Sequence, residues 1–186
     1  MTIVLSRCVV RSWQRADVSS LVSHANDRDI WLNLRDRFPH PYTRKDGVGF
    51  VKLARAMRPE VHFAIDVSGE AVGAIGFLLR DDVDRVSAEV GYWLGRAHWG
   101  RGIATEALVG VTRYACDTHG LTRMFATPFA HNLASCRVLE KAGYMLEGRL
   151  TRSAIKDGQV LDQLQYAFPG PCQSSTLLDT PSDAGV

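Results

Sequence analysis

The order of apolar runs and amphipathic segments along the chain predicts an α/β (α+β) domain built on one mixed sheet. Its 186 residues suit a single domain with a substantial core. Apolar residues make up 46% of the chain and charged residues 23%, which is ordinary for a globular protein. The elements should follow as strand, two helices, three strands, helix, strand, helix and two strands. We therefore expect a mostly antiparallel central sheet of about six to seven strands, with helices on both faces.

The first part of the chain should supply one strand and two helices. Residues 8–11 form an apolar run typical of a strand. Residues 18–25 carry apolar side chains at i, i+3, i+4 and i+7, which predicts an amphipathic helix. Two prolines in the segment 35–42 exclude regular structure there and predict a loop. Thr43 and Asp46 then form a capping-box pattern that opens the second helix.

The remaining elements follow from turn signals and periodicity. Ser68-Gly69-Glu70 and Asp157-Gly158 each predict a hairpin turn between two strands, and 81–85 is a charged turn. Strands are expected over 61–67, 71–79, 87–94, 121–127, 144–156 and 159–168, and helices over 103–118 and 135–142.

These elements place one domain over residues 1–168. The last segment, 169–186, reads PGPCQSSTLLDTPSDAGV and is rich in Pro, Ser, Gly and Asp. Such a composition buries little apolar surface, so we expect a disordered C-terminal tail outside the domain.

Composition also excludes several classes of function. A net charge of +2 gives no argument for a nucleic-acid-binding surface, although it is compatible with a local basic patch around a phosphate-bearing cofactor. No apolar run approaches the roughly twenty residues needed to span a bilayer, and the N-terminus lacks a signal-peptide pattern. We expect a cytoplasmic protein. The cysteines and histidines show no metal-ligand spacing, so we expect no metal.

The most informative loop, WGRGIA, lies at 99–104 between a strand and a helix that opens near Ile103. Its two glycines lack bulk where a ligand would approach the backbone, and free N–H groups at a helix start favour anions. Arg101 adds a cation suited to phosphate. The pattern indicates a pyrophosphate site, whereas the glycines alone would equally fit a tight strand-to-helix turn.

This loop resembles the pyrophosphate loop of the GNAT superfamily of N-acetyltransferases, whose form is Q/R-x-x-G-x-G/A. Trp99 departs from the first position, but an aromatic residue there is usual in the Rim-type branch that acetylates ribosomal-protein N-termini. Residues 132–144, NLASCRVLEKAGY, resemble a second segment of that branch, N-x-x-S-x-x-V-L-E-K-x-G-aromatic. The two motifs occur in the right order, and the resemblance covers about residues 7–168.

The resemblance implies a GNAT fold and an enzyme that moves acetyl from acetyl-CoA to a primary amine by direct attack in a ternary complex. In this superfamily the strand before the loop splays from its neighbour and leaves backbone N–H groups for the thioester and pantetheine. The residues expected to bind the cofactor are Tyr92, Trp93, Leu94, Trp99, Gly100, Arg101, Gly102, Ile103, Ala104, Thr105, Asn132, Ser135, Arg137 and Lys141. The amide that polarises the thioester carbonyl should come from 91–93.

Two residues are expected to carry the chemistry. Glu89 is the candidate general base, because an amine of pKa ~10 must lose a proton before it attacks; the alternative is a plain ion pair with an arginine such as Arg80 or Arg85. The resemblance makes Ser135 the candidate acid for the leaving thiolate, although Ser135 could also cap its helix.

Two further side chains offer alternatives to this assignment. Tyr144 could supply the proton instead of Ser135, or could pack in the core. Cys136 raises the question of an acetyl-cysteine intermediate, but no histidine adjoins it in the sequence, so we expect a packed thiol.

The acceptor pocket of this branch is built from the first helices and the far end of the sheet. Its expected members are Asn33, Arg35, Phe38 and Tyr42, with Tyr92 facing them from the sheet. The acceptor could be a protein N-terminus or a small molecule such as an amino acid, a polyamine or an aminoglycoside. A non-catalytic acetyl-CoA sensor is the rival class. A homodimer is also left open, because dimers are common in the family and the hairpin 144–168 offers an edge.

Overall fold

The computed structural model describes residues 1–168, so the segment predicted to be a tail, 169–186, lies outside the described residues. Eight strands form one sheet in the order β1-β2-β3-β4-β5-β6-β8-β7. Neighbouring strands are antiparallel except for β5 and β6, which are parallel. The strands are β1 (Thr2–Val4), β2 (Val9–Ser12), β3 (His62–Val67), β4 (Glu70–Leu79), β5 (Ser87–Leu94), β6 (Arg123–Ala126), β7 (Met145–Lys156) and β8 (Gln159–Ala167).

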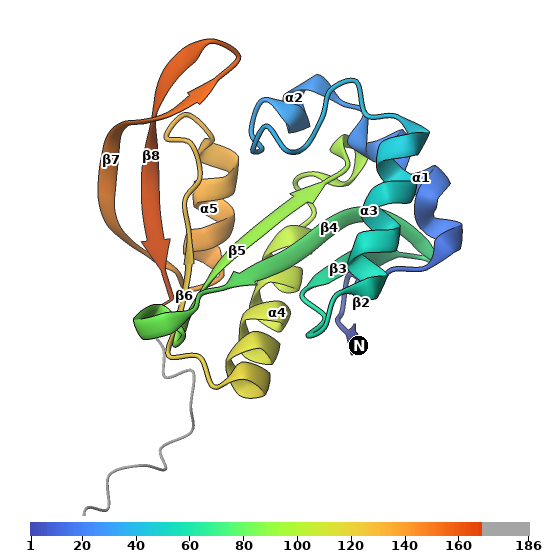
Figure 1. Ribbon diagram of the computed structural model, residues 1–186, viewed down its shortest axis with the longest axis horizontal. Coiled ribbons are helices and arrows are strands. Elements are labelled where there is room, and N and C mark those ends of the chain that lie inside the picture. The colour runs from blue at the N-terminus through green and yellow to red at the C-terminus, as the bar shows by residue number, and fades with distance from the viewer. Residues whose placement is uncertain (169–186) are drawn as a thin grey trace, which may run out of the picture.

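Helices cover both faces of the sheet, as predicted (Figure 1). The helices are α1 (Val18–Ala25), α2 (Arg28–Trp31), α3 (Arg44–Ala56), α4 (Ile103–His119) and α5 (Leu133–Lys141). Residues of α1 and α3 pack with one set of strand side chains, whereas α4 and α5 pack with the alternating set on the opposite face. None of the helices within residues 1–168 is long and apolar enough to span a membrane.

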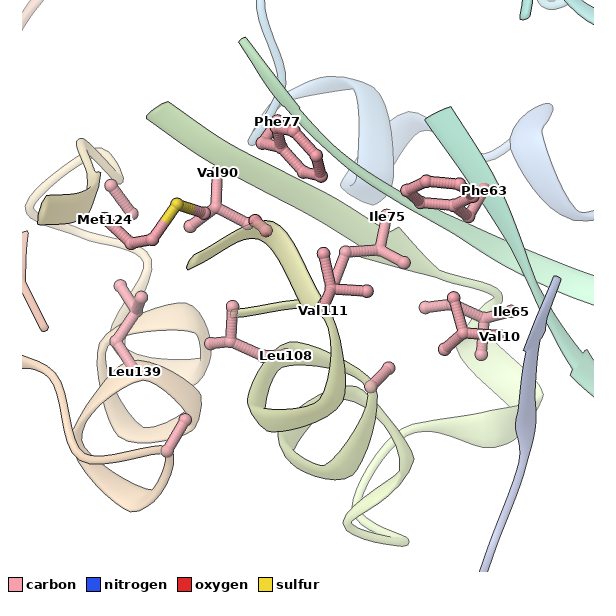
Figure 2. Close-up of a cluster of buried hydrophobic side chains, with 14 of the residues drawn as sticks. Val10, Phe63, Ile65, Ile75, Phe77, Val90, Leu108, Val111, Met124 and Leu139 are labelled. Carbon is pink, nitrogen blue, oxygen red and sulfur yellow. The ribbon is translucent and has the colours of Figure 1, made fainter. Parts of the chain in front are cut away.

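The larger part of the core lies between the sheet and α4 with α5 (Figure 2). Phe63, Ile75 and Phe77 point from β3 and β4 toward Leu108 and Val111 of α4, and all five side chains are buried. Burying a side chain of this size contributes about 1.5–3 kcal/mol. These buried side chains of α4 therefore form the face that packs the helix against the sheet.

Two elements escaped the sequence analysis. β1 has three residues, too few to show a period, and it makes the sheet one strand larger than the six to seven expected. α2 is a single turn within the segment before the proline-containing loop. The Asp27 side chain caps α2 by accepting hydrogen bonds from the backbone N–H groups of Asp29 and Ile30, which is a readable signal in the sequence. The predicted capping box of Thr43 and Asp46 is confirmed at the start of α3.

The pairing between β5 and β6 is short, and this opens the sheet. β5 pairs with β4 along its whole length, from Ala88 opposite Leu79 to Leu94 opposite Gly73. Its pairing with β6 ends at Glu89, opposite Phe125. Beyond Glu89, this side of β5 has no strand partner among residues 1–168. The backbone groups of the last part of β5 are thus left for another partner.

The tip of the β7–β8 hairpin is attached to the segment around α2 (Figure 1). The Lys156 ammonium lies 2.8 Å from Asp36 Oδ1 and 3.9 Å from the centroid of the Trp31 ring. Arg28 Nη2 lies 2.8 Å from Asp157 Oδ2. We call these contacts the hairpin clasp. It fixes the loop after α2, which carries the predicted acceptor residues.

Candidate functional site

The loop between β5 and α4 has the conformation that its glycines permit. Gly100 and Gly102 have φ angles of +74° and +75°, a region in which other residues cost about 1–2 kcal/mol. Gly102 is the N-cap of α4, and no side chain caps this 17-residue helix. The first N–H groups of α4, those of Ile103, Ala104 and Thr105, therefore have no acceptor within the helix.

The space beside these glycines suits a diphosphate. A Cβ atom at Gly100 would meet nothing within 4 Å, and the atoms nearest to one at Gly102 would be those of the Arg7 side chain, at 3.6 Å or more. Arg101 is exposed and forms no ion pair within residues 1–168. Trp99 Nε1 donates a 2.6 Å hydrogen bond to the Leu94 carbonyl, which ties the loop to the end of β5. An uncapped helix start, a free arginine and open space together fit the pyrophosphate of coenzyme A.

The second motif forms the start of α5. Asn132 is its N-cap, and the Asn132 side-chain oxygen accepts a 3.0 Å hydrogen bond from Ser135 N–H. Ser135 therefore does not cap the helix, and its hydroxyl is free for another role. Arg137 and Lys141 lie further along α5, exposed and without ion pairs within the described chain.

Tyr92 of β5 meets Ser135 across the opening between β5 and β6. The two hydroxyl oxygens lie 2.9 Å apart, and the Tyr92 hydroxyl also donates to the Ser135 carbonyl at 3.2 Å. Burial is the main cause that raises the pKa of Tyr92 well above its usual range, so the phenol stays protonated and can donate a hydrogen bond to Ser135.

One expectation for Tyr92 is corrected. Its ring packs in the cluster on the α4 and α5 face, not toward the loop that carries Phe38. Neighbouring side chains of a strand point to opposite faces, so the next residue, Trp93, takes that position. The Trp93 and Phe38 ring centroids are 5.8 Å apart.

Glu89 lies where β5 leaves β6, and its carboxylate is held on both oxygens. Oε1 lies 2.9 Å from Arg35 Nη2 and accepts a 2.8 Å hydrogen bond from Thr127 Oγ1. Oε2 lies 3.2 Å from Arg80 Nη2. The predicted ion pair with Arg80 is present, and Arg35, predicted as an acceptor residue, is the second cation. Thr127, at the end of β6, carries no sequence signal that would have identified it.

The side chains of Tyr144 and Cys136 are both packed in the core. Tyr144 is buried, and its hydroxyl lies 2.7 Å from Thr112 Oγ1 of α4. Cys136 is also buried, and burial is the main cause that raises the pKa of its thiol. A nucleophilic cysteine needs the opposite shift. Of the two candidate acids, Ser135 and Tyr144, only Ser135 therefore has its hydroxyl at the opening in the sheet.

The remaining predicted acceptor residues gather after α2. The Phe38 ring lies 4.8 Å from the Tyr42 ring, and Tyr42 is buried beneath it. Asn33 donates to the Asp29 carbonyl at 2.8 Å, while its buried side-chain oxygen has no hydrogen-bond partner among the described residues. Within the described chain no cluster of three or more His, Cys, Asp or Glu could hold a metal ion.

Comparison with known proteins decides the family. Residues 7–145 match the family model described as an acetyltransferase (GNAT) domain. The chain belongs to the GNAT acetyltransferase family. Members of this family transfer acetyl from acetyl-CoA.

Relatives and solved structures agree with this assignment. The ribosomal-protein-serine acetyltransferase of Escherichia coli (strain K12) is 30% identical over 125 residues, covering 67% of this chain and 69% of that protein. The uncharacterized N-acetyltransferase p20 of Bacillus licheniformis is 25% identical, covering 90% and 95%. A ribosomal L7/L12 α-N-protein acetyltransferase, RimL, in complex with coenzyme A shares the fold with a TM-score of 0.79, 19% identity and coverage of 90% and 97%.

Proposed function

We propose that this GNAT enzyme acetylates the primary amine of an acceptor by direct attack on bound acetyl-CoA, with both substrates present together. The observation that carries the proposal is the pair of hydroxyl groups of Tyr92 and Ser135, 2.9 Å apart beside the opening that begins at Glu89. A candidate proton donor and a candidate base thus lie on either side of the same break in the sheet.

Each group has a distinct task. Acetyl-CoA supplies an acyl group activated as a thioester. The unpaired backbone of β5 after Glu89 offers N–H groups for the carbonyl oxygen as it gains negative charge. Glu89 accepts a proton from the acceptor ammonium, directly or through a water, and Ser135 donates a proton to the departing thiolate. Tyr92 holds the Ser135 hydroxyl in position.

Named relatives support a protein N-terminus as one class of acceptor. The Escherichia coli relative is a ribosomal-protein-serine acetyltransferase, and RimL acetylates the α-amino group of ribosomal L7/L12, as their names state. The basic side chains around Glu89 favour such an acceptor, or an amino acid, over a polyamine or an aminoglycoside. A cytoplasmic location accords with this function.

The decisive experiment measures free coenzyme A with a thiol reagent across amino acids, N-terminal peptides, polyamines and aminoglycosides. Wild type is compared with Ser135→Ala and Glu89→Gln. The control is Arg85→Ala, because Arg85 donates to the Asp82 carbonyl in the turn before β5 and forms no ion pair with Glu89. Turnover with one amine class, reduced at least tenfold by the first two changes and kept by the third, would support the proposal. Tight binding of acetyl-CoA with no turnover of any amine would favour the sensor instead.

We also propose a homodimer that uses β7, because β7 is the last strand at one edge of the sheet. Met145, Leu146 and Ile155 of this strand are exposed, and an exposed apolar edge favours pairing with another strand. Light scattering of the purified protein measures the mass, and a monomer at micromolar concentration would contradict the dimer.

A further inference from the structure

Arg35 joins the predicted acceptor segment directly to the candidate base. One nitrogen, Nη2, makes both of its contacts, at 2.9 Å to Glu89 Oε1 and 2.6 Å to Thr127 Oγ1. The other donors of this guanidinium, Nε and Nη1, have no hydrogen-bond partner among residues 1–168. The side chain is 46% exposed. Each bidentate fork of a guanidinium includes Nη2, so an acceptor carboxylate that binds Arg35 with two hydrogen bonds uses Nη2 together with the free Nε or Nη1.

The carboxylates of the segment after α2 and of the β7–β8 hairpin are already paired. On the segment after α2 and on the β7–β8 hairpin, Asp36 pairs with Lys156, and Asp157 pairs with Arg28. Asp162 of β8 pairs with Arg149. Glu147 of β7 pairs with Arg123. A polycationic acceptor would meet no free carboxylate on these two elements, whereas an anionic group would meet the free Nε and Nη1 groups of Arg35.

The carboxylate of Glu89 is occupied in the absence of an acceptor. Arg35 holds one oxygen and Arg80 the other. An acceptor ammonium group can reach the Glu89 carboxylate only if Arg35 or Arg80 moves away from it or shares one of its oxygens. An acceptor anion on Arg35 would compete with Glu89 for the same positive charge, and it would bring the acceptor's own ammonium group to the side of Glu89.

We propose that Arg35 binds the acceptor and selects amines that carry a carboxylate close to the amino group, such as an α-amino acid or an N-terminal residue with an acidic side chain. The inference rests on the proposed acetyl transfer. The acceptor carboxylate binds Arg35 through Nη2 and a neighbouring nitrogen, which loosens the hold of Arg35 on Glu89. The ammonium proton then passes to Glu89, and the amine forms the C–N bond. The C–S bond breaks, the sulfur receives the proton of Ser135, and the second proton lost by the nitrogen replaces it on Ser135.

Matched acceptors test the selectivity. We compare an amino acid with its amide and its decarboxylated amine, and peptides that begin with Asp or Glu with those that begin with Asn or Gln. We take the series, amino acids or peptides, that the wild type uses faster. In that series, wild type should show at least a tenfold higher kcat/KM for the acceptor with the carboxylate than for its uncharged counterpart. Arg35→Ala should bring that ratio close to one, and Arg35→Lys should keep part of it, since a lysine keeps the charge but not the fork. Arg37→Ala, two residues away and without an ion pair among the described residues, should keep the full ratio.

A binding measurement separates this inference from the proposed function. In calorimetry with the complex of enzyme and coenzyme A, the carboxylate acceptor should bind at least tenfold tighter than its amide, and Arg35→Ala should abolish the difference. Equal use and equal binding of the matched acceptors by wild type would overturn the inference while leaving acetyl transfer intact. If Arg35→Ala lowers kcat/KM equally for both matched acceptors, Arg35 has a structural role, and the inference is again overturned. Binding selectivity without any turnover would instead overturn the proposed function.

Discussion

The hydroxyl oxygens of Tyr92 and Ser135 lie 2.9 Å apart, although the residues belong to a strand and a helix 43 positions apart in the sequence. Burial keeps Tyr92 protonated, and its single O–H lies within reach of both the Ser135 carbonyl and the Ser135 hydroxyl oxygen. When this O–H donates to the hydroxyl oxygen, the serine proton is left for another acceptor. The pair thus orients the group that we assign as the acid.

Tyr92→Phe should lower kcat, because it removes this hydrogen bond and keeps the ring. A neutral hydrogen bond is worth about 0.5–1.5 kcal/mol, which corresponds to a decrease of about two- to tenfold. The KM for acetyl-CoA should change little. Steady-state release of coenzyme A measures both constants.

Tyr144→Phe is the matched control, because it removes a hydroxyl bonded to Thr112 in the core. It should keep kcat and lower the free energy of unfolding by about 1 kcal/mol, measured in urea. A loss of kcat as large as that of Tyr92→Phe would contradict the distinction between the two tyrosines.

Gly102→Ala should weaken acetyl-CoA binding and destabilise the fold by about 1–2 kcal/mol, because the φ of this residue is positive. Calorimetric titration with acetyl-CoA and urea denaturation measure the two effects. The control is Gly49→Ala within α3, where a Cβ atom meets nothing within 4 Å. Alanine there should raise stability by about 0.5–1 kcal/mol, since glycine costs that much in a helix. Unchanged affinity in Gly102→Ala would contradict the assignment of the loop.

The sequence predicted much of the fold because its signals are local. The Thr43–Asp46 capping box, the Asp157-Gly158 turn and the periodic face of α4 are each readable within a few residues. The elements that it missed, β1 and α2, are too short for a period.

The contacts of the candidate site could not be predicted in the same way. The motifs indicated that Glu89 and Ser135 matter, but the position of Arg35 and Thr127 on Glu89 depends on residues 54 and 38 positions away. The orientation of Tyr92 was predicted wrongly because it depends on strand register, and a shift of one residue exchanges the two faces.

Lys156→Met should loosen the attachment of the hairpin tip. Lys156 is 2% exposed and its partner Asp36 is 74% exposed, so the change leaves no buried unpaired carboxylate. Loss of the ion pair and of the contact with Trp31 should cost about 1–2 kcal/mol, measured by urea denaturation. Val160→Thr, at an exposed position of the same hairpin, should stay within about 0.5 kcal/mol of wild type. Equal stability of the two variants would show that the Lys156 contacts of the clasp contribute nothing.

His62 should make stability depend on pH. Burial is the main cause that lowers its pKa below the ordinary value of 6.5. The unfolded chain therefore binds more protons than the fold as the pH falls. The contribution of His62 is complete above about pH 6.5 and is lost as the pH falls through the lowered pKa of the folded state. Urea denaturation at pH 7.5 and 5.5 should show a smaller decrease for His62→Gln than for wild type, and identical decreases would exclude this role.

The hairpin clasp also has a consequence for synthesis of the chain. Lys156 and Asp36 are 120 positions apart, and Asp157 and Arg28 are 129 apart. During translation the segment after α2 leaves the ribosome long before its partners exist. The acceptor side of the site therefore reaches its final form only when the hairpin has emerged. A nascent chain that already contains the loop 99–104 is still an incomplete enzyme.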